Sequence, residues 1–594
     1  MKKKKRDIVA DNTMKDALED LNISAPSTSP EKKFSIRDAI WNYPKTFLML
    51  YKKLIPLSYI FLFAIVAGIL VLFLNSSVVS KVGKESVRKD TFVEGLVGTV
   101  DSLNPLFVTN NFSDRAIQSL VFQKFVNIDN EGNPIAGVAS SWITSENGLV
   151  VDFKIDDGLK WSDGSDLTVD DVVFTFETAI ALAKRSGFDS VGEAFQDIGV
   201  EKIDNETVRF QLKERNPVFF KAISIYIVPK SRLEEVDVGR MAFDHFAKYP
   251  MGSGKFHVVK IDDYEVVLED NEYDKYEPKI KKLVLKIYPT LEAEEMAFRV
   301  GNLDAVGGWD RKSFRYTEEY RNYSKYSMTI RDREKLIFFN LRKDSLKNEN
   351  MRRALNYLLD KERYLEELDV GGEIMHGPFP KTSWAYSDDF EKYQYNPQKA
   401  KELLKDLGYV MNTESGYYET ENKEILNFTL SYLDTPTNSR MAELLIDYYK
   451  KEGVFLKGNG VGYDQITQEI IATRNFEMLL YEVETAIDPD QYNLWHSLKV
   501  NYPDLNLSGY DYERVDILLE EARQTINKDT RKQKYTLFQR YLNNDSPVIF
   551  LYNPSFEYIV DSGLKGIDLE SINNSYDRFH NIEEWYWSNA KGGS

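Results

Sequence analysis

The chain has 594 residues, of which 42% are hydrophobic and none is cysteine, and its formal net charge is −18. This length is enough for two or more domains or lobes with a sizeable core. The lack of cysteine in this sequence excludes disulfides, thiol catalysis, cysteine-ligated zinc and lipid attachment through a cysteine. The acidic balance argues against nucleic acid as a partner.

Residues 1–55 form a basic, polar stretch with 12 Lys or Arg against 7 Asp or Glu. We expect this tail to be largely disordered, with aromatic residues between Phe34 and Tyr51 that fit an amphipathic helix in the membrane interface. The positive-inside rule places the tail in the cytoplasm. The remainder of the chain, which carries a net charge of −23, then lies outside the cell.

A membrane span is predicted from the uncharged stretch Leu54–Ser80. Its centre, Leu57–Leu74, would be about 27 Å long as a helix, close to the roughly 30 Å thickness of the hydrocarbon core. We therefore predict a transmembrane helix over 56–75, a linker over 76–90 and an extracellular domain over 91–594, so that the protein is single-pass in the cell membrane. A signal peptide cleaved after Ser80 is the alternative, although the apolar run exceeds the about 7–15 residues typical of one.

The extracellular part alternates strand and helix patterns. Residues 150–155 alternate apolar and polar side chains, as a half-buried strand does. Thr168 and Asp171 have the spacing of a capping box, in which the hydroxyl accepts from the Asp171 amide and the carboxylate reaches back. A further helix is expected to begin after Asn396 and to end at Gly408. Such alternation predicts an α/β fold.

Several short motifs occur in the order found in one known family. They are Leu103-Asn-Pro105, Val138-Ala-Ser-Ser-Trp142, Lys160-Trp-Ser-Asp-Gly164, Val228-Pro-Lys230, Gly252-Ser-Gly-Lys-Phe256, Phe338-Phe-Asn-Leu341, Met351-Arg-Arg-Ala-Leu355, Asp488-Pro-Asp490 and Pro547-Val-Ile-Phe-Leu-Tyr552. Over residues 92–570 the sequence resembles the peptide-type extracellular solute-binding proteins of ABC importers, family 5, which include oligopeptide, dipeptide and nickel binders.

This resemblance implies a two-lobed type II periplasmic-binding-protein fold, similar to cluster C and with an extra subdomain. Lobe I would comprise about 91–333 and 546–590, and lobe II about 341–540. Strands near 335–340 and 547–552 would act as hinges that let the lobes close on a ligand.

The function implied is capture of peptides or peptide-like solutes and their delivery to the permease subunits of an ABC transporter. We expect no catalytic residues, metal or cofactor, because no HExxH, GxSxG or P-loop pattern occurs. The protein is expected to be a monomer. Three alternatives stay open. The protein could be a receptor that signals through the span, or a folding helper or scaffold. It could also bind nickel, with His376 and His496 as candidate ligands, or another solute.

The resemblance also suggests where the ligand lies. In peptide-binding members an acid before the Asp-Pro motif holds the ligand's amino terminus. Thr485 occupies that position here, so either Glu484 takes over the role, or the anchor is missing and the ligand is not an ordinary peptide with a free amino terminus. The candidate ligand-binding residues are Val108, Thr109, Asn110, Trp384, Tyr481, Glu482, Val483, Glu484, Thr485, Asp488, Trp495 and Tyr552.

Overall fold

The structure is a computed structural model, which describes residues 90–107, 111–129, 131–186, 195, 198–216, 218–309, 322–485, 488–569 and 574–588. These belong to one compact unit, Ser86–Ser594. The predicted tail over 1–55, the predicted transmembrane helix over 56–75 and nearly all of the predicted linker lie outside the described residues. None of the helices in the described ranges is both long and apolar enough to cross a membrane.

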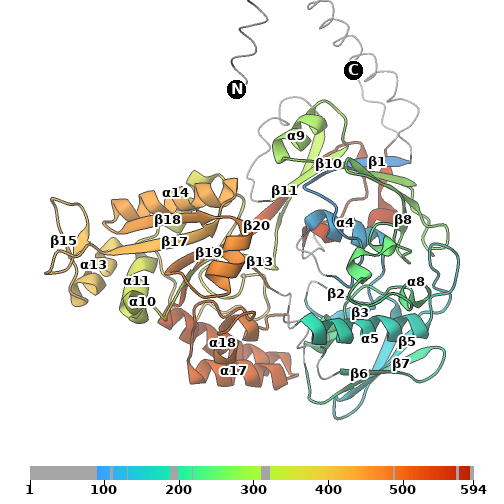
Figure 1. The fold of residues 1–594 in the computed structure, drawn as a ribbon, viewed down its shortest axis with the longest axis horizontal. Helices are drawn as coiled ribbons and strands as arrows, with labels where there is room; N and C mark the ends of the chain where they lie inside the picture. The colour runs from blue at the N-terminus through green and yellow to red at the C-terminus, as the bar shows by residue number, and fades with distance from the viewer. Residues whose placement is uncertain are drawn as a thin grey trace, which may run out of the picture. The chain divides into compact units, whose positions relative to one another are not determined.

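A twelve-stranded sheet runs through this unit (Figure 1). Ten of its strands follow the order β18 (Phe455–Val461), β17 (Asn427–Leu433), β19 (Met478–Glu484), β13 (Arg333–Phe339), β20 (Val548–Asp561), β11 (Ala305–Trp309), β1 (Thr91–Val97), β10 (Lys282–Tyr288), β9 (Glu265–Asp270) and β8 (Phe256–Ile261). The other two, β12 (Tyr323–Thr329) and β14 (Gly372–Ile374), also pair with β20.

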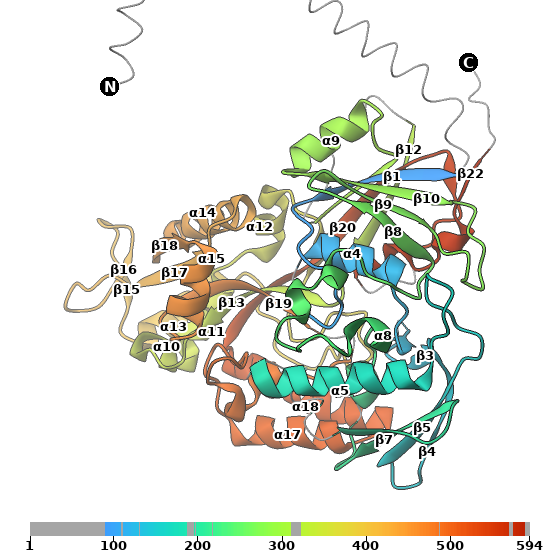
Figure 2. The ribbon, with the colours of Figure 1, turned by 45° about the vertical axis from the view of Figure 1, so that its right-hand side comes forward.

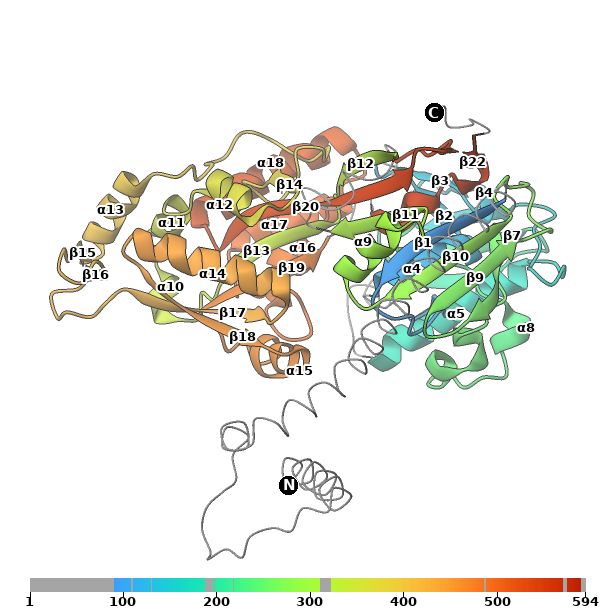
Figure 3. The ribbon, with the colours of Figure 1, turned by 90° about the horizontal axis from the view of Figure 1, so that it is seen from above.

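Strand β20 is the element shared by the two ends of this sheet. Its residues from Val548 to Val560 are all buried, including the polar Asn553, Ser555 and Glu557 in the middle of the strand. The first part of β20 pairs with β13 and β14, and the second part with β11 and β12. Figure 3 shows β13 and β20 running side by side between two groups of elements.

We call the first group the first half, because its core comes from residues 92–330 and 556–585. It also holds a four-stranded sheet in the order β4-β5-β7-β6, and Figure 2 shows helix α5 along this sheet. The remaining strands are β2 (Val126–Ile128), β3 (Pro134–Ala136), β4 (Ala139–Thr144), β5 (Val150–Ile155), β6 (Ile198–Lys202), β7 (Thr207–Leu212), β21 (Leu564–Lys565) and β22 (Tyr586–Trp587). The helices are α4 (Phe112–Val121), α5 (Val169–Ser186), α7 (Phe219–Ala222), α8 (Lys230–Leu233), α9 (Leu291–Arg299), η1 (Met241–Phe243), η2 (His245–Ala247), η5 (Ser575–Phe579) and η6 (Ile582–Glu584).

The carboxy-terminal segment completes the core of the first half. Trp585 is fully buried and packs edge-on against Phe92 of β1, with the ring centroids 5.5 Å apart. Arg578 and Glu94 are buried together, and the Arg578 Nε donates to the Glu94 carboxylate at 2.8 Å. The two ends of the described unit are therefore tied to each other.

The second half, built from residues 336–552, has one core on each face of its strands. Along β13, Ile337 and Phe339 enter one core while Leu336 and Phe338 enter the other, which is the period-two alternation of a strand. The helices are α10 (Asp344–Lys347), α11 (Glu349–Tyr357), α12 (Lys361–Leu368), α13 (Pro397–Asp406), α14 (Pro436–Lys451), α15 (Tyr463–Gln465), the π-helix η3 (Ile466–Ile471), α16 (Tyr492–Trp495), η4 (Ser497–Lys499), α17 (Glu513–Gln524) and α18 (Lys528–Asp545). A short hairpin joins β15 (Val410–Met411) to β16 (Tyr418–Glu419).

Two predicted helix starts are present. Ahead of α5, the Asp171 carboxylate reaches back to the Thr168 amide at 2.8 Å, as predicted; the Thr168 hydroxyl, however, donates to that carboxylate at 3.1 Å and does not accept from the Asp171 amide. Ahead of α13, the Asn396 side chain accepts from the Lys399 amide at 3.0 Å. Gly408 follows this helix with a φ of +85°, the left-handed conformation that glycine adopts most readily.

Candidate ligand-binding site

A cavity of about 230 Å³ lies where β13 begins, beside the loop 378–384, the segment after β19 and the start of α18. Glu131, in the turn between β2 and β3, adds a wall from the first half. The lining residues are Glu131, Arg331, Glu334, Pro378, Phe379, Pro380, Thr382, Ser383, Trp384, Thr485, Pro489, Gln491 and Lys528. The lining mixes five apolar side chains with eight polar or charged ones, so the cavity offers both apolar contact and hydrogen-bonding groups to a small ligand.

Two of the predicted ligand-binding residues, Trp384 and Thr485, line this cavity. The Trp384 ring is half-buried. The Lys528 ammonium and the Arg531 guanidinium lie 5.4 and 5.5 Å from its centroid, within the range of cation–π attraction. Trp384 is thus a positioned aromatic wall of the cavity.

Glu334 on β13 also lines the cavity, and sequence reasoning missed it. It lies on the same face of β13 as Leu336 and Phe338, two and four residues further on, and its side chain is only 1% exposed. Burial raises the pKa of its carboxyl group to about 8, against the opposing effect of a hydrogen bond from the Thr485 side chain. The sequence does contain a clue, because Glu334 stands two residues before Leu336 and so falls on the same face as the apolar side chains of a predicted hinge strand.

A second buried acid precedes β13. The Asp332 carbonyl accepts from the Thr485 amide at 2.6 Å, which ties the start of β13 to the end of β19. Burial, and then the nearby charge of Glu484, raise the pKa of the Asp332 carboxyl to about 8. Segment 332–334 therefore brings two poorly solvated carboxyl groups to the region of the cavity.

Replacing Glu334 with glutamine should stabilise the protein at pH 8 and leave its stability unchanged near pH 4. The folded-state pKa is above the unfolded value of 4.5, so the acid contributes its full stability below that value and loses it as the pH rises toward about 8. A gain of about 2–4 kcal/mol at pH 8 corresponds to this shift. Urea unfolding of both proteins at the two pH values measures it, and an equal difference at both would contradict the expectation.

The other face of β13 carries a compact ion cluster. The Glu482 carboxylate lies 2.6 Å from the Arg333 guanidinium and 2.9 Å from the Lys335 ammonium. Burial opposes the charge of Glu482, but Lys335 and Arg333 outweigh it and lower the pKa of this acid. Glu482, a predicted ligand-binding residue, is thus engaged by its neighbours in the sheet.

Glu484 joins the two halves. Its carboxylate lies 2.6 Å from the guanidinium of Arg115 on α4. The Arg115 guanidinium also lies 5.3 Å from the centroid of the Tyr576 ring. Although burial opposes its charge, Glu484 and Tyr576 raise the pKa of Arg115. The acid next to Thr485 is therefore held by a cation of the protein itself.

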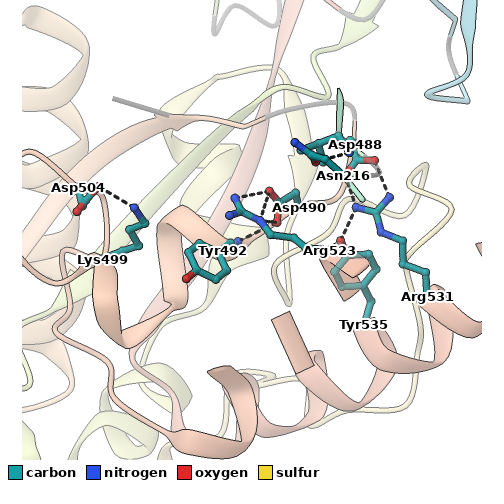
Figure 4. Close-up of polar contacts among 10 residues, drawn as sticks. Asn216, Asp488, Asp490, Tyr492, Lys499, Asp504, Arg523, Arg531 and Tyr535 are labelled. Atoms are coloured by element: carbon teal, nitrogen blue, oxygen red, sulfur yellow. Dashed lines mark hydrogen bonds and ion pairs between the residues drawn. The ribbon is translucent and has the colours of Figure 1, made fainter. Parts of the chain in front are cut away.

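The Asp488-Pro489-Asp490 segment is fixed by two arginines from neighbouring helices (Figure 4). Arg531 of α18 donates to both carboxylate oxygens of Asp488, at 2.7 and 2.6 Å. Arg523 of α17 donates to the Asp490 carboxylate at 2.9 and 2.7 Å. Asp488 was predicted to bind ligand, but its carboxylate is occupied by this pair. The arrangement positions Pro489 and Gln491 in the wall of the cavity.

The other predicted residues that the structure describes are not part of the lining of the cavity. Trp495 and Tyr552 are 1% and 0% exposed and lie in the two cores of the second half. Val483 is buried in the same core as Trp495, and Tyr481 packs partly buried against it. Residues 108–110, which include Val108, Thr109 and Asn110, lie outside the described residues.

The two candidate metal ligands do not belong to a metal cluster in the described part of the chain, where no group of three or more His, Asp or Glu side chains is placed to hold an ion. His496 is 2% exposed, and its Nε2 lies 3.2 Å from Glu520. Burial lowers the pKa of His376 to about 4.

The profile of the bacterial extracellular solute-binding proteins, family 5, middle region, matches residues 133–506. The chain is 27% identical over 524 residues to the oligopeptide-binding protein AppA of Bacillus subtilis, covering 86% of this chain and 94% of that protein.

Two solved structures share the fold. The structure of Bacillus subtilis AppA in complex with a nonapeptide matches with a TM-score of 0.70 and 24% identity, over 84% of this chain and 99% of AppA. NikZ of Campylobacter jejuni, in complex with Ni(L-His), matches with a TM-score of 0.71 and 26% identity, over 84% of this chain and 100% of NikZ. The mixed α/β fold is therefore that of the periplasmic binding proteins.

Proposed function

The chain belongs to the bacterial extracellular solute-binding proteins of family 5, and we propose that it captures peptides or peptide-like solutes outside the cell and delivers them to an ABC transporter permease. As a member of this family it is a binding protein and not an enzyme. The observation that carries the proposal is the cavity whose walls come from Glu131 in the first half and from β13 and Trp384 in the second.

Peptides fit the chemistry of this cavity. Its lining combines carboxylates, basic groups, hydroxyls and an amide with the rings of Phe379 and Trp384. A peptide presents charged ends, main-chain donors and acceptors, and varied side chains, and each finds a complementary group there. The nonapeptide held by AppA supports the same class of ligand.

Closure of the two halves on the ligand is the second part of the proposal. In this view lobe I comprises about 91–333 and 546–590, lobe II about 341–540, and β13 and β20 are the hinge strands. Support comes from the pairing of β20 with strands of both halves and from the Arg115–Glu484 ion pair between them. A ligand that contacts both lobes favours the closed form by its differential affinity, and the permease then recognises that form.

The membrane anchor completes the proposal. A single helix over 56–75, with the tail inside, would hold a monomeric binding domain at the outer membrane face. The support is the uncharged run Leu54–Ser80 and the excess of basic residues before it. Such an anchor does the work of a lipid, for which this sequence offers no cysteine.

Native mass spectrometry of the full chain, purified in detergent from its own cells, tests the ligand class. We expect copurified peptides of narrow length range, identified by sequencing after release. Bound metal or sugar without peptide would contradict the proposal.

Uptake assays test delivery. Deleting the gene should abolish uptake of a labelled peptide mixture, and a variant that lacks residues 1–45 but keeps the span should restore it. Intact ligand binding with no uptake defect in the deletion strain would instead favour a receptor.

A further inference from the structure

The start of β13 presents an acid where the strand's neighbours on that face are apolar. Leu336 and Phe338 pack in a core that also holds Phe379 and Trp495. Glu334 lies on the same face of β13, opposite Val483 of β19. It lines the cavity, as does Phe379 from that core. Burial at such a position removes the hydration of an acid, and apolar neighbours offer no hydrogen bond or charge to compensate for it.

The two oxygens of Glu334 differ in their partners. One is hydrogen-bonded by the Thr485 side chain. The other, Oε1, is buried and has no hydrogen-bond partner. Within the described residues Glu334 also takes part in no ion pair, although the side chain is 99% buried. Buried carboxyl groups are ordinarily paired or fully hydrogen-bonded. The described part of the protein supplies no hydrogen-bond partner for Oε1, so a bound ligand could supply one.

The bases on the adjacent strand positions are engaged elsewhere. Arg333 and Lys335 point to the opposite face of β13, as alternation requires, and both pair with Glu482. Arg331 and Lys528 line the same cavity as Glu334, and Glu131 faces it from the first half. The cavity therefore combines one partly unpartnered carboxyl group with basic groups that would suit the anionic end of a ligand.

We propose that Glu334 is the residue that binds a positively charged amino group of the ligand, with the Thr485 hydroxyl orienting its carboxylate. This inference rests on the proposed function and names the residue that supplies specificity within it. An ammonium group would give Oε1 a charge-assisted hydrogen bond and would offset the desolvation of the acid. Glu484, held by Arg115, and Asp488, held by Arg531, are each already neutralised.

The test uses the full chain in detergent and three nonapeptide libraries made without arginine. The first has free α-amino groups and no lysine, the second is the same library N-acetylated, and the third is N-acetylated with one lysine per peptide. Glu334→Gln should lower the affinity for the charged library that the natural protein prefers by about 10- to 100-fold. Its affinity for the uncharged second library should be unchanged.

The control is Glu414→Gln, an exposed glutamate in the turn between β15 and β16, which should bind all libraries as the natural protein does. Preference for the first library identifies the α-amino group as the cation, and preference for the third identifies a lysine side chain. Both results support the assignment.

Three results would overturn it. If the natural protein bound all three libraries with equal affinity, no cation would be recognised. This result does not depend on whether Glu334→Gln folds. Equal affinities of Glu334→Gln and the natural protein for the charged libraries would remove Glu334 from the site while leaving peptide binding intact. Failure of the natural protein to bind any library would contradict the peptide function itself, and this inference with it.

Discussion

Replacing Arg531 with methionine is expected to lower the free energy of unfolding by about 3–5 kcal/mol, because the substitution leaves the Asp488 carboxylate largely buried without its cation. The side chains of Arg531 and Asp488 are 6% and 14% exposed. Their two parallel hydrogen bonds have the bidentate geometry that makes such pairs strong. Methionine retains most of the aliphatic volume, so the change removes the charge together with the hydrogen bond to the Tyr535 hydroxyl and the contact over the Trp384 ring. Urea unfolding followed by tryptophan fluorescence measures the loss.

Lys534→Met on the same helix provides the matched control. Lys534 pairs with Glu521, whose side chain is half-exposed, so its removal should cost less than about 1 kcal/mol. The double variant Asp488→Asn/Arg531→Met should recover much of the loss, since it buries no lone charge. If Arg531→Met were no more costly than Lys534→Met, the Asp488 segment would not depend on this pair.

The affinity for a peptide with a free amino terminus should be greatest near pH 8 and fall on the order of tenfold per pH unit below it. Burial raises the pKa of Glu334 to about 8, so the empty site holds a proton at pH 6–7 that the ligand's cation must displace. Above pH 8 the peptide's α-amino group, with a pKa of about 7.7–8.0, loses its own charge. Calorimetry in buffers of different ionisation enthalpy measures both the affinity and the protons released.

Other charged groups share this environment and must be separated from Glu334. Arg331, Lys528 and Glu131 line the cavity, and Asp332, whose pKa is also about 8, precedes the strand. Because Asp332 titrates in the same range, it would add a dependence of the same sign. The slope should disappear in Glu334→Gln; a slope that persists there would assign the proton to Asp332 instead.

Local features of the fold could be predicted from the sequence. The Asp171 carboxylate and the Asn396 side chain cap the helices they were expected to cap, because a cap depends on residues three or four positions apart. The alternation of residues 150–155 likewise appears as β5. The α/β class follows from such segments, since each must bury an apolar face.

The site was harder to predict because it depends on contacts between distant segments. Thr485 and Trp384 were expected near the ligand, but Glu334 was missed because its importance comes from the apolar wall around it. Asp488 has the sequence context of a ligand contact, and only the fold brings Arg531, 43 positions away, to its carboxylate. Trp495 is an aromatic residue close to the Asp-Pro motif in sequence, but its ring is buried in the core.

The position of Trp585 and Arg578 in the core of the first half has a consequence for how the chain matures. Residues 336–552 form their cores from one continuous stretch and can fold as soon as that stretch has left the ribosome or the export channel. The first half begins earlier but stays incomplete until Trp585 has emerged and packed against Phe92. The part of the protein that is made first therefore finishes folding last, and its exposed apolar strands must be kept from aggregating in the interval.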